Sequence, residues 1–342
     1  MIPLFALILS PLIFAPRLID GYTGPKLAFV IVVGIVLAAT SLKRPKPPRI
    51  LYPLLGFVGW GLLSYFWSIN PYTWLFAVAV DIVSLVAFWE TTALLDDGKK
   101  IDKAILVFVL VAAVMATYGI VSGSAGSTMK NPGYAALHLA GAVPLSVYLI
   151  LHSKNYKTMV LFSAFCILLV VFVFQLPNRL AIPSLAVGTY SFFLQRDRWF
   201  AVGLVCCIAL FLFFYPSLLS SRLPTWQNAA MAWVDSPVAG FGRGQFGIVY
   251  PKYANRVVRD PQFDMIQVSA GSFSSRTTVA HAHNDFLELF FELGPVGLIV
   301  FVYFLGSLIL DAQNWDLRSI CLFSSLGVFF VYMMFWFVLA LP

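Results

Sequence analysis

Residues 103–122, KAILVFVLVAAVMATYGIVS, form one of the apolar runs that decide the fold class of this chain. No charged residue follows Lys103 within the run, and a helix needs about 20 apolar residues to cross the hydrocarbon core of a bilayer. Comparable runs lie near residues 2–16, 26–42, 50–68, 73–95, 132–152, 157–176, 179–195, 199–219, 285–310 and 317–341. The sequence therefore predicts an all-α polytopic membrane protein with about 11 transmembrane helices, within a range of about 10 to 12.

The composition of the 342-residue chain supports a membrane protein and excludes other classes. Hydrophobic residues make up 60% and charged residues only 11%, whereas a soluble domain carries roughly a quarter charged residues. The net charge of +7 does not indicate nucleic-acid binding, because the basic residues lie in short loops and form no stripe with interleaved aromatics. The four cysteines lie in apolar runs without CxxC spacing, which predicts neither a disulfide nor a metal site.

The basic residues of the short loops predict the orientation. The N-terminus is apolar from Ile2 and lacks the basic region and cleavage site of a signal peptide, so we interpret it as a first membrane segment. With the N-terminus in the cytoplasm, the inner loops hold 12 Lys and Arg residues and the short outer loops hold 4, as the positive-inside rule requires. The predicted parts are nine membrane helices in 1–219, a long periplasmic loop at 220–284 with short helices, and two further membrane helices in 285–342.

The outer loop ends in the segment His281-Ala282-His283-Asn284-Asp285, which carries the densest polar chemistry of the sequence. Asp285 and Glu288 have the spacing of a capping box, which predicts that a membrane helix begins here. A helix N-terminus favours nearby anions and a neutral imidazole, so a histidine at this place could act as a general base near neutral pH. Metal binding by the two histidines and a purely structural cap remain as alternatives.

Several charged residues are predicted to converge near the same outer surface. Glu288 and Glu292 lie one turn apart and share a helix face. Asp81 lies about 12 Å into a span that is entered from outside. Arg179 is expected at the outer mouth of the eighth span, and Arg222 opens the long loop. Ionisable residues at such depth indicate either a functional site or structural ion pairs that lock helices together, and the residues alone favour neither.

The run Gly240-Phe241-Gly242-Arg243-Gly244 offers a second anion-binding feature in the same loop. Its backbone N–H groups and the Arg243 guanidinium could surround a phosphate. A flexible turn explains the glycines equally well.

The outer loop and the helix after it resemble a known family. HAHNDFLELFFELGPVG, at 281–297, resembles the His-Asn signature of the O-antigen ligase and polymerase superfamily. The segments 222–231, 236–246 and 250–251 are similar to further patterns of that family, and Asn131-Pro132 and Asn178-Arg179 match weaker ones. The resemblance covers about residues 130–310, and the order of the motifs is more specific than any one of them.

This resemblance implies an enzyme of the bacterial inner membrane whose active site faces the periplasm. It would transfer a glycan from undecaprenyl pyrophosphate to a hydroxyl of an acceptor glycolipid or glycan, among membrane lipids and without nucleotide sugar, metal or cofactor. His283 would be the catalytic base, and Arg179 and Arg222 would bind the pyrophosphate. Arg243 is added as a third pyrophosphate-binding residue because glycines surround it, and not because of the family pattern. Supporting roles are expected for His281, Asn284, Asp285 and Glu288.

Several functions remain open at this point. A ligase, a polymerase of O-antigen or exopolysaccharide, and an O-linked protein glycosyltransferase differ only in their acceptor. From another class, a membrane transporter or exporter could use Asp81, Glu90, Glu288 and Glu292 as a proton pathway. The sequence shows no internal repeat of the kind that many transporters have.

Overall fold

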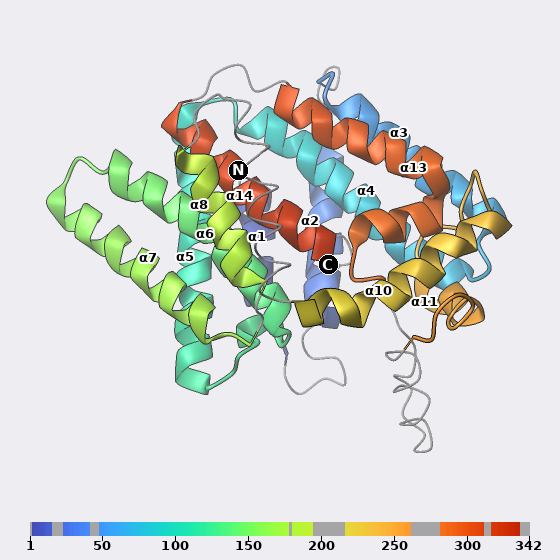
Figure 1. Cartoon of the computed structure of the whole chain (residues 1–342). Coiled ribbons are helices and arrows are strands. Elements are labelled where there is room, and N and C mark those ends of the chain that lie inside the picture. Colours follow the sequence, from blue (N-terminus) through green and yellow to red (C-terminus); the bar gives the residue numbers. More distant parts are fainter. Residues whose placement is uncertain are drawn as a thin grey trace.

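The computed structural model describes residues 2–15, 23–41, 48–177, 180–193, 216–260, 281–310 and 316–335. Every regular element in these ranges is helical, which confirms the predicted all-α class (Figure 1). The helices are α1 (Ile2–Leu9), α2 (Thr23–Ser41), α3 (Leu51–Leu63), α4 (Pro71–Leu94), α5 (Gly98–Ser122), α6 (Pro132–His152), α7 (Tyr156–Gln175), α8 (Ala181–Phe193), α10 (Pro216–Met231), α11 (Phe246–Val249), α13 (Asp285–Leu310) and α14 (Leu317–Phe335). Short 3-10 turns include η2 (Ser64–Trp67), η3 (Ser127–Met129) and η4 (Ala232–Asp235).

Six helices of the described ranges are long and apolar enough to cross a membrane, namely α4, α5, α6, α7, α13 and α14. The apolar helices Gly24–Ala39 and Leu51–Trp67 are shorter. The protein is therefore a membrane protein by the length and composition of its helices, while the count of about 11 spans is not confirmed. Most of the predicted span 199–219 lies outside the described residues.

Asparagine and aspartate side chains mark where the long helices begin. The side chain of Asn70 accepts hydrogen bonds from two backbone N–H groups of the first turn of α4, at 2.9 and 3.3 Å. Asn131 caps α6 in the same way at 2.8 Å. Proline follows each of them at the first helical position, where no intrahelical N–H is needed. Asp97 and Asn155 cap α5 and α7.

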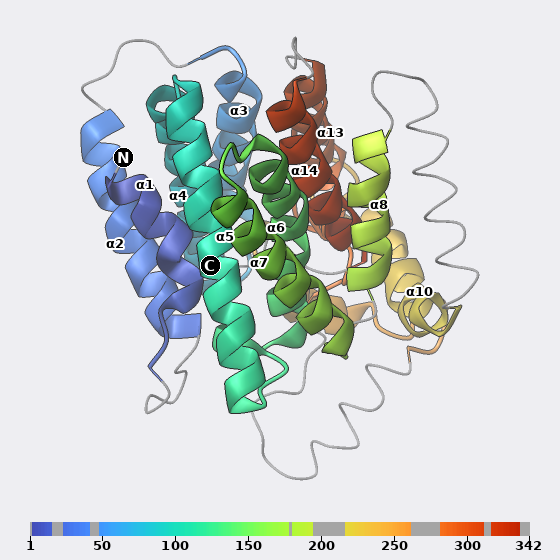
Figure 2. The same cartoon turned by 90° about the vertical axis from the view of Figure 1, so that its left-hand side faces the viewer.

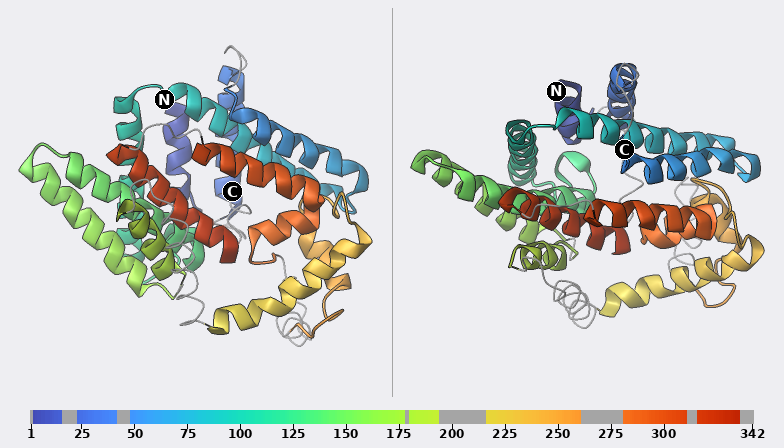
Figure 3. Two further views of the ribbon diagram at one scale, coloured as in Figure 1. Left: turned by 45° about the horizontal axis from the view of Figure 1, so that its top comes forward. Right: turned by 90° about the horizontal axis from the view of Figure 1, so that it is seen from above.

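The helices enclose two large hydrophobic cores that meet along α14. One core joins α5, α6, α7, α8 and α14, and fully buried alanines such as Ala135 and Ala140 let the helices approach closely. The other joins α3, α4 and α13 around Leu51 and Leu293, with Met333 of α14 at its border. Figure 3 shows α13 lying between the pair α3 and α4 on one side and α10 on the other.

α10 lies across one end of the bundle, and we call this end the loop end (Figure 2). It carries α10, the following segment 232–260, and the first turns of α4, α6 and α13. At the opposite end, Arg318 Nε donates to Asp102 at 2.9 Å and Tyr148 donates to the same carboxylate at 2.6 Å. These contacts tie the ends of α5, α6 and α14 together, so the loop end rests on a braced bundle.

Candidate functional site at the loop end

The helix α13 breaks in the middle, and the break receives the outer loop. Gly294 has φ +65°, which an L side chain rarely adopts, and Pro295 follows it without an N–H group. The carbonyl of Phe291, whose partner in a regular helix would be residue 295, accepts a hydrogen bond from the N–H of Phe241 at 3.0 Å. The carbonyls of Glu292 and Leu293 accept from Gly242 N at 2.7 Å and from Trp60 Nε1 at 2.9 Å. The break at Gly294 and Pro295 therefore leaves carbonyl groups of α13 free to bind the outer loop and Trp60.

Glycine is required on the loop side of this contact as well. Gly240 and Gly242 have φ of +69° and +101°. A Cβ atom at Gly240 would lie 2.5 Å from the Glu292 backbone, and one at Gly242 would lie 2.1 Å from Ser68 Oγ. The glycines allow the loop to approach α13 and η2 at backbone distance, and they are not simply a flexible turn.

Arg243 is buried between two helices and binds their carboxylates. Its Nε and Nη2 atoms donate to both oxygens of Asp81 on α4 at 2.8 and 3.0 Å, and Nη1 donates to Glu292 on α13 at 2.8 Å. The backbone N–H of Arg243 donates to Ser64 Oγ at 3.0 Å. Burial works against its charge, but the two carboxylates outweigh burial and raise the pKa of Arg243. We call Arg243 with Asp81 and Glu292 the arginine clamp.

This arrangement differs from the role that the glycine context predicted for Arg243. Arg243 is only 6% exposed, and its Nε, Nη1 and Nη2 atoms are all directed at carboxylates. A pyrophosphate would have to displace Asp81 or Glu292 to reach it. The structure thus favours a structural ion pair over an anion site at this position, because the protein itself supplies the anions.

The first turn of α13 is capped one residue earlier than the sequence predicted. The side chain of Asn284, rather than that of Asp285, accepts the hydrogen bond of the Leu287 N–H, at 2.9 Å. Asp285 is the first residue of the helix and is buried. Glu288 does reach back across the helix start, as a capping box requires, but to residues further upstream.

Glu288 holds the histidine segment. Its Oε1 atom lies 2.9 Å from His281 Nδ1, and its Oε2 atom accepts the N–H of Ala282 at 2.8 Å. On the other side of the segment, the indole of Trp226 on α10 donates to the carbonyl of Ala282 at 2.7 Å. Burial alone would lower the pKa of His281, but the Glu288 carboxylate outweighs burial and raises it. The backbone just before His283 is therefore fixed from both sides.

His283 is half-buried and has φ +54°, a left-handed conformation that is uncommon for a residue with a side chain. Burial first, and then the positive charge of Arg222, lower its pKa to about 4. The imidazole is therefore neutral near pH 7 and has a lone pair that can accept a proton. The neutral form is the one that the predicted general base requires, while the low pKa makes the imidazole a weaker base than a free histidine.

Among the described residues, Arg222 is the predicted arginine whose charge acts on His283. It is buried on α10, where it donates a hydrogen bond to the carbonyl of Phe335 at the end of α14. Burial lowers its pKa to about 10, so it keeps its positive charge at neutral pH. Arg179 lies outside the described residues.

The carboxylates proposed for a proton pathway divide between two separate groups. Asp81 and Glu292 belong to the arginine clamp, whereas Glu288 binds the histidine segment. Glu90 is buried nine residues after Asp81 on α4, a separation of about 13 Å along the helix. The geometry favours two structural ion clusters over a chain of proton carriers.

Sequence reasoning missed contributions that come from distant elements. Tyr134, near the start of α6, lies close enough to Asp285 and Glu288 to interact with them electrostatically. Asp260 accepts hydrogen bonds from Thr225 and from Tyr250, which closes the segment 232–260 against α10. No local sequence pattern indicated the latter contacts, because they form only when the loop segment folds against α10.

Comparison with protein families identifies the family of this chain. The family model described as O-antigen ligase matches residues 128–302, which are 175 of the 342 residues and thus just over half of the chain. The matched range begins just before α6 and ends beyond the break in α13. It therefore includes His281 and His283, and it includes the arginine clamp except for Asp81. No curated protein matches the chain.

Proposed function

Because the chain belongs to the O-antigen ligase family, we propose that it is a membrane glycosyltransferase that moves a glycan from undecaprenyl pyrophosphate to a hydroxyl of an acceptor glycan or glycolipid. The loop end faces the periplasm in this proposal, and the N-terminus lies in the cytoplasm. The excess of Lys and Arg in the opposite loops supports this orientation. The protein then resides in the bacterial inner membrane, where the lipid carrier places its pyrophosphate at headgroup depth.

The observation that carries the proposal is a neutral histidine held in a strained conformation beside a buried arginine. His283 accepts the proton of the acceptor hydroxyl while the oxygen forms a bond to the anomeric carbon of the donor sugar. The bond from that carbon to the pyrophosphate breaks, and its electron pair leaves with the pyrophosphate. His283 afterwards releases the proton to water.

Arg222 supports this step electrostatically. Its positive charge lies close enough to His283 to lower the pKa of the imidazole, which keeps the free imidazole neutral. In the proposed step the same charge stabilises the pyrophosphate as negative charge grows on it. Arg179 remains a proposed second cation on the resemblance alone. Arg243 takes a different part, since it holds the loop in place and need not touch the substrate.

Replacing His283 by alanine tests the proposal. Purified protein in liposomes with an undecaprenyl-pyrophosphate-linked glycan and an acceptor should lose roughly 10²- to 10⁴-fold in transfer rate, the usual contribution of a general base. His152 offers a matched control, because it lies at the opposite end of α6 with 56% of its side chain exposed. The variant H152A should transfer at the normal rate, and normal transfer by H283A would contradict the proposal.

The product of the same assay separates the ligase from the polymerase. A ligase attaches the glycan to a lipid A–core acceptor, whereas a polymerase lengthens the lipid-linked glycan itself. We favour the ligase, and a longer lipid-linked product formed in the absence of core acceptor would assign the polymerase instead. Flux of the lipid-linked glycan across the liposome membrane without any glycosyl product would favour a transporter.

A further inference from the structure

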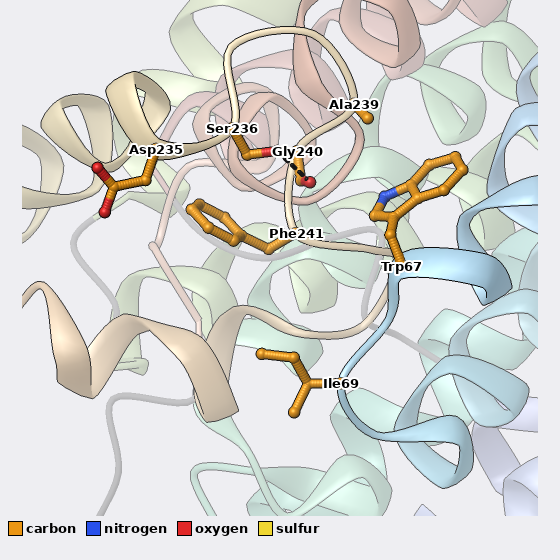
Figure 4. Close-up of a pocket in the computed structure, with 7 residues that line it drawn as sticks. All are labelled: Trp67, Ile69, Asp235, Ser236, Ala239, Gly240 and Phe241. Carbon is orange, nitrogen blue, oxygen red and sulfur yellow. Dashed lines mark hydrogen bonds between the residues drawn. The ribbon is translucent and has the colours of Figure 1, made fainter.

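A cavity of about 320 Å³ lies at the loop end beside the arginine clamp (Figure 4). Its walls come from two places far apart in sequence. Trp67 and Ile69 follow α3, and the other wall, at the end of η4 and just after it, consists of Asp235, Ser236, Ala239, Gly240 and Phe241. The volume is within the range of small-molecule sites, which are roughly 300–1,000 Å³.

The aromatic side chains of the cavity offer flat faces and one hydrogen-bond donor. Figure 4 shows the pyrrole edge of Trp67, which carries Nε1, turned toward Gly240 and Phe241. Among the described residues this buried N–H group has no hydrogen-bond partner. A buried donor without an acceptor costs free energy, and an indole N–H in such a place usually finds one. A ligand oxygen in the cavity would supply it.

The polar groups of the cavity suit a neutral ligand. Ser236 Oγ donates to the carbonyl of Gly240 at 2.6 Å and keeps its lone pairs for accepting. No Lys or Arg is among the described residues that line the cavity. The carboxylate of Asp235 turns away from the Trp67–Phe241 pair in Figure 4, toward Tyr253 and Arg256, to which it is hydrogen-bonded. A phosphate would therefore find no counter-charge here.

The walls are held in place by aromatic packing and by hydrogen bonds to the break in α13. Trp67 packs against Trp60 with ring centroids 5.4 Å apart, and Trp60 is bound to the break in α13. Phe241 packs on Phe291 at 4.7 Å, and its backbone N–H is bound to the carbonyl of the same residue. The cavity is thus largely preformed, which lowers the entropy cost of binding.

We propose that this cavity is a subsite for a neutral sugar unit of the glycan, with Trp67 as the face on which the ring stacks and as a donor to one of its oxygens. Sugars combine an apolar C–H face with hydroxyl groups, which matches an aromatic wall that has one buried donor and one acceptor. The inference rests on the proposed function for the source of the sugar. Phe291 lies six residues beyond Asp285, about 9 Å along α13, so the subsite holds a unit remote from the bond that reacts at His283.

Saturation-transfer NMR on the full chain in detergent micelles tests the subsite without any transfer reaction. The probes are the methyl glycosides of glucose, galactose and N-acetylglucosamine. At least one should receive saturation from the wild-type protein. The variant W67F, which keeps a smaller aromatic ring and loses the indole N–H, should bind it roughly 2- to 10-fold more weakly, the equivalent of about one hydrogen bond. The variant W67A should lose detectable binding.

Trp89 provides the control, because it lies near the end of α4, packs against the core of α3, α4 and α13 and does not line the cavity. Binding by W89F should equal that of wild type. H283A should also bind the sugar normally, so loss of the catalytic role and loss of the subsite are distinguishable. Absence of binding by all three probes, or equal binding by wild type and W67A, would overturn the subsite. Displacement of the sugar by farnesyl pyrophosphate in wild type would assign the cavity to the lipid instead.

Discussion

Replacing Arg243 by glutamine removes the cation that Asp81 and Glu292 share. The three side chains are at most 9% exposed, and with both carboxylates ionised the clamp has a net charge of −1. R243Q leaves two buried carboxylates facing each other, whereas D81N leaves one neutral ion pair. Breaking a buried pair by removing one partner typically costs 3–5 kcal/mol, about the cost that we expect for R243Q. D81N should cost clearly less, because the charges that remain cancel.

Thermal unfolding of the purified protein in detergent, followed by tryptophan fluorescence, measures this order. R243Q should lower Tm by an amount of the order of 10 °C, and D81N by a smaller amount. The control is R256Q: Arg256 pairs with Asp235 in the same segment, but its side chain is 46% exposed, so Tm should hardly change. Equal effects of R243Q and D81N, or a larger effect of D81N, would refute the charge balance assigned to the clamp.

Three further predictions concern α13 and the residues before it. G294A should lower Tm, because φ is +65° and the new Cβ would lie 2.1 Å from the Val238 carbonyl oxygen, whereas G306A, whose Cβ would meet nothing within 4 Å, should not. The free energy of unfolding should fall as the pH drops from about 6.5 to 4, because the folded protein holds the pKa of His283 at about 4 while the unfolded chain takes up the proton near 6.5. H283Q should remove this pH dependence in Tm scans, and an unchanged slope would contradict the prediction. E288Q should reduce transfer roughly tenfold by weakening the His281 contact, measured in the liposome assay.

The long helices were predictable because their signals are local. The predicted spans 132–152 and 285–310 coincide with α6 and α13, since each begins at a polar cap and continues through apolar residues without a charge near its middle. The segment 2–16 gives a shorter helix, α1, because the apolar run is interrupted by Pro11, which lies in a 3-10 turn. The described part of the segment 179–195 contains α8. An apolar run thus predicts a helix more securely than it predicts a membrane crossing.

The partners of the charged residues were not predictable, because they depend on tertiary contacts. The sequence placed Glu288 and Glu292 on one face of one helix, and in the structure they lie close enough to interact electrostatically. It gave no means of pairing Arg243 with Asp81, which lies 162 residues earlier in the chain. The glycines around Arg243 indicated an anion-binding loop, whereas their close approach to α13 shows that backbone packing is the reason for them.

The two glutamates of α13 act in the same way on two parts of one loop. Each binds a cationic or titratable side chain with one oxygen and a backbone N–H with the other: Glu292 binds Arg243 and Phe246 N, and Glu288 binds His281 and Ala282 N. The glutamates are one turn apart on a helix segment that ends at Gly294, so the segment fixes the distance between the clamp and the histidines. If the proposed sugar subsite at Phe241 and the proposed base His283 act on one glycan, that glycan meets a preset separation between the two places.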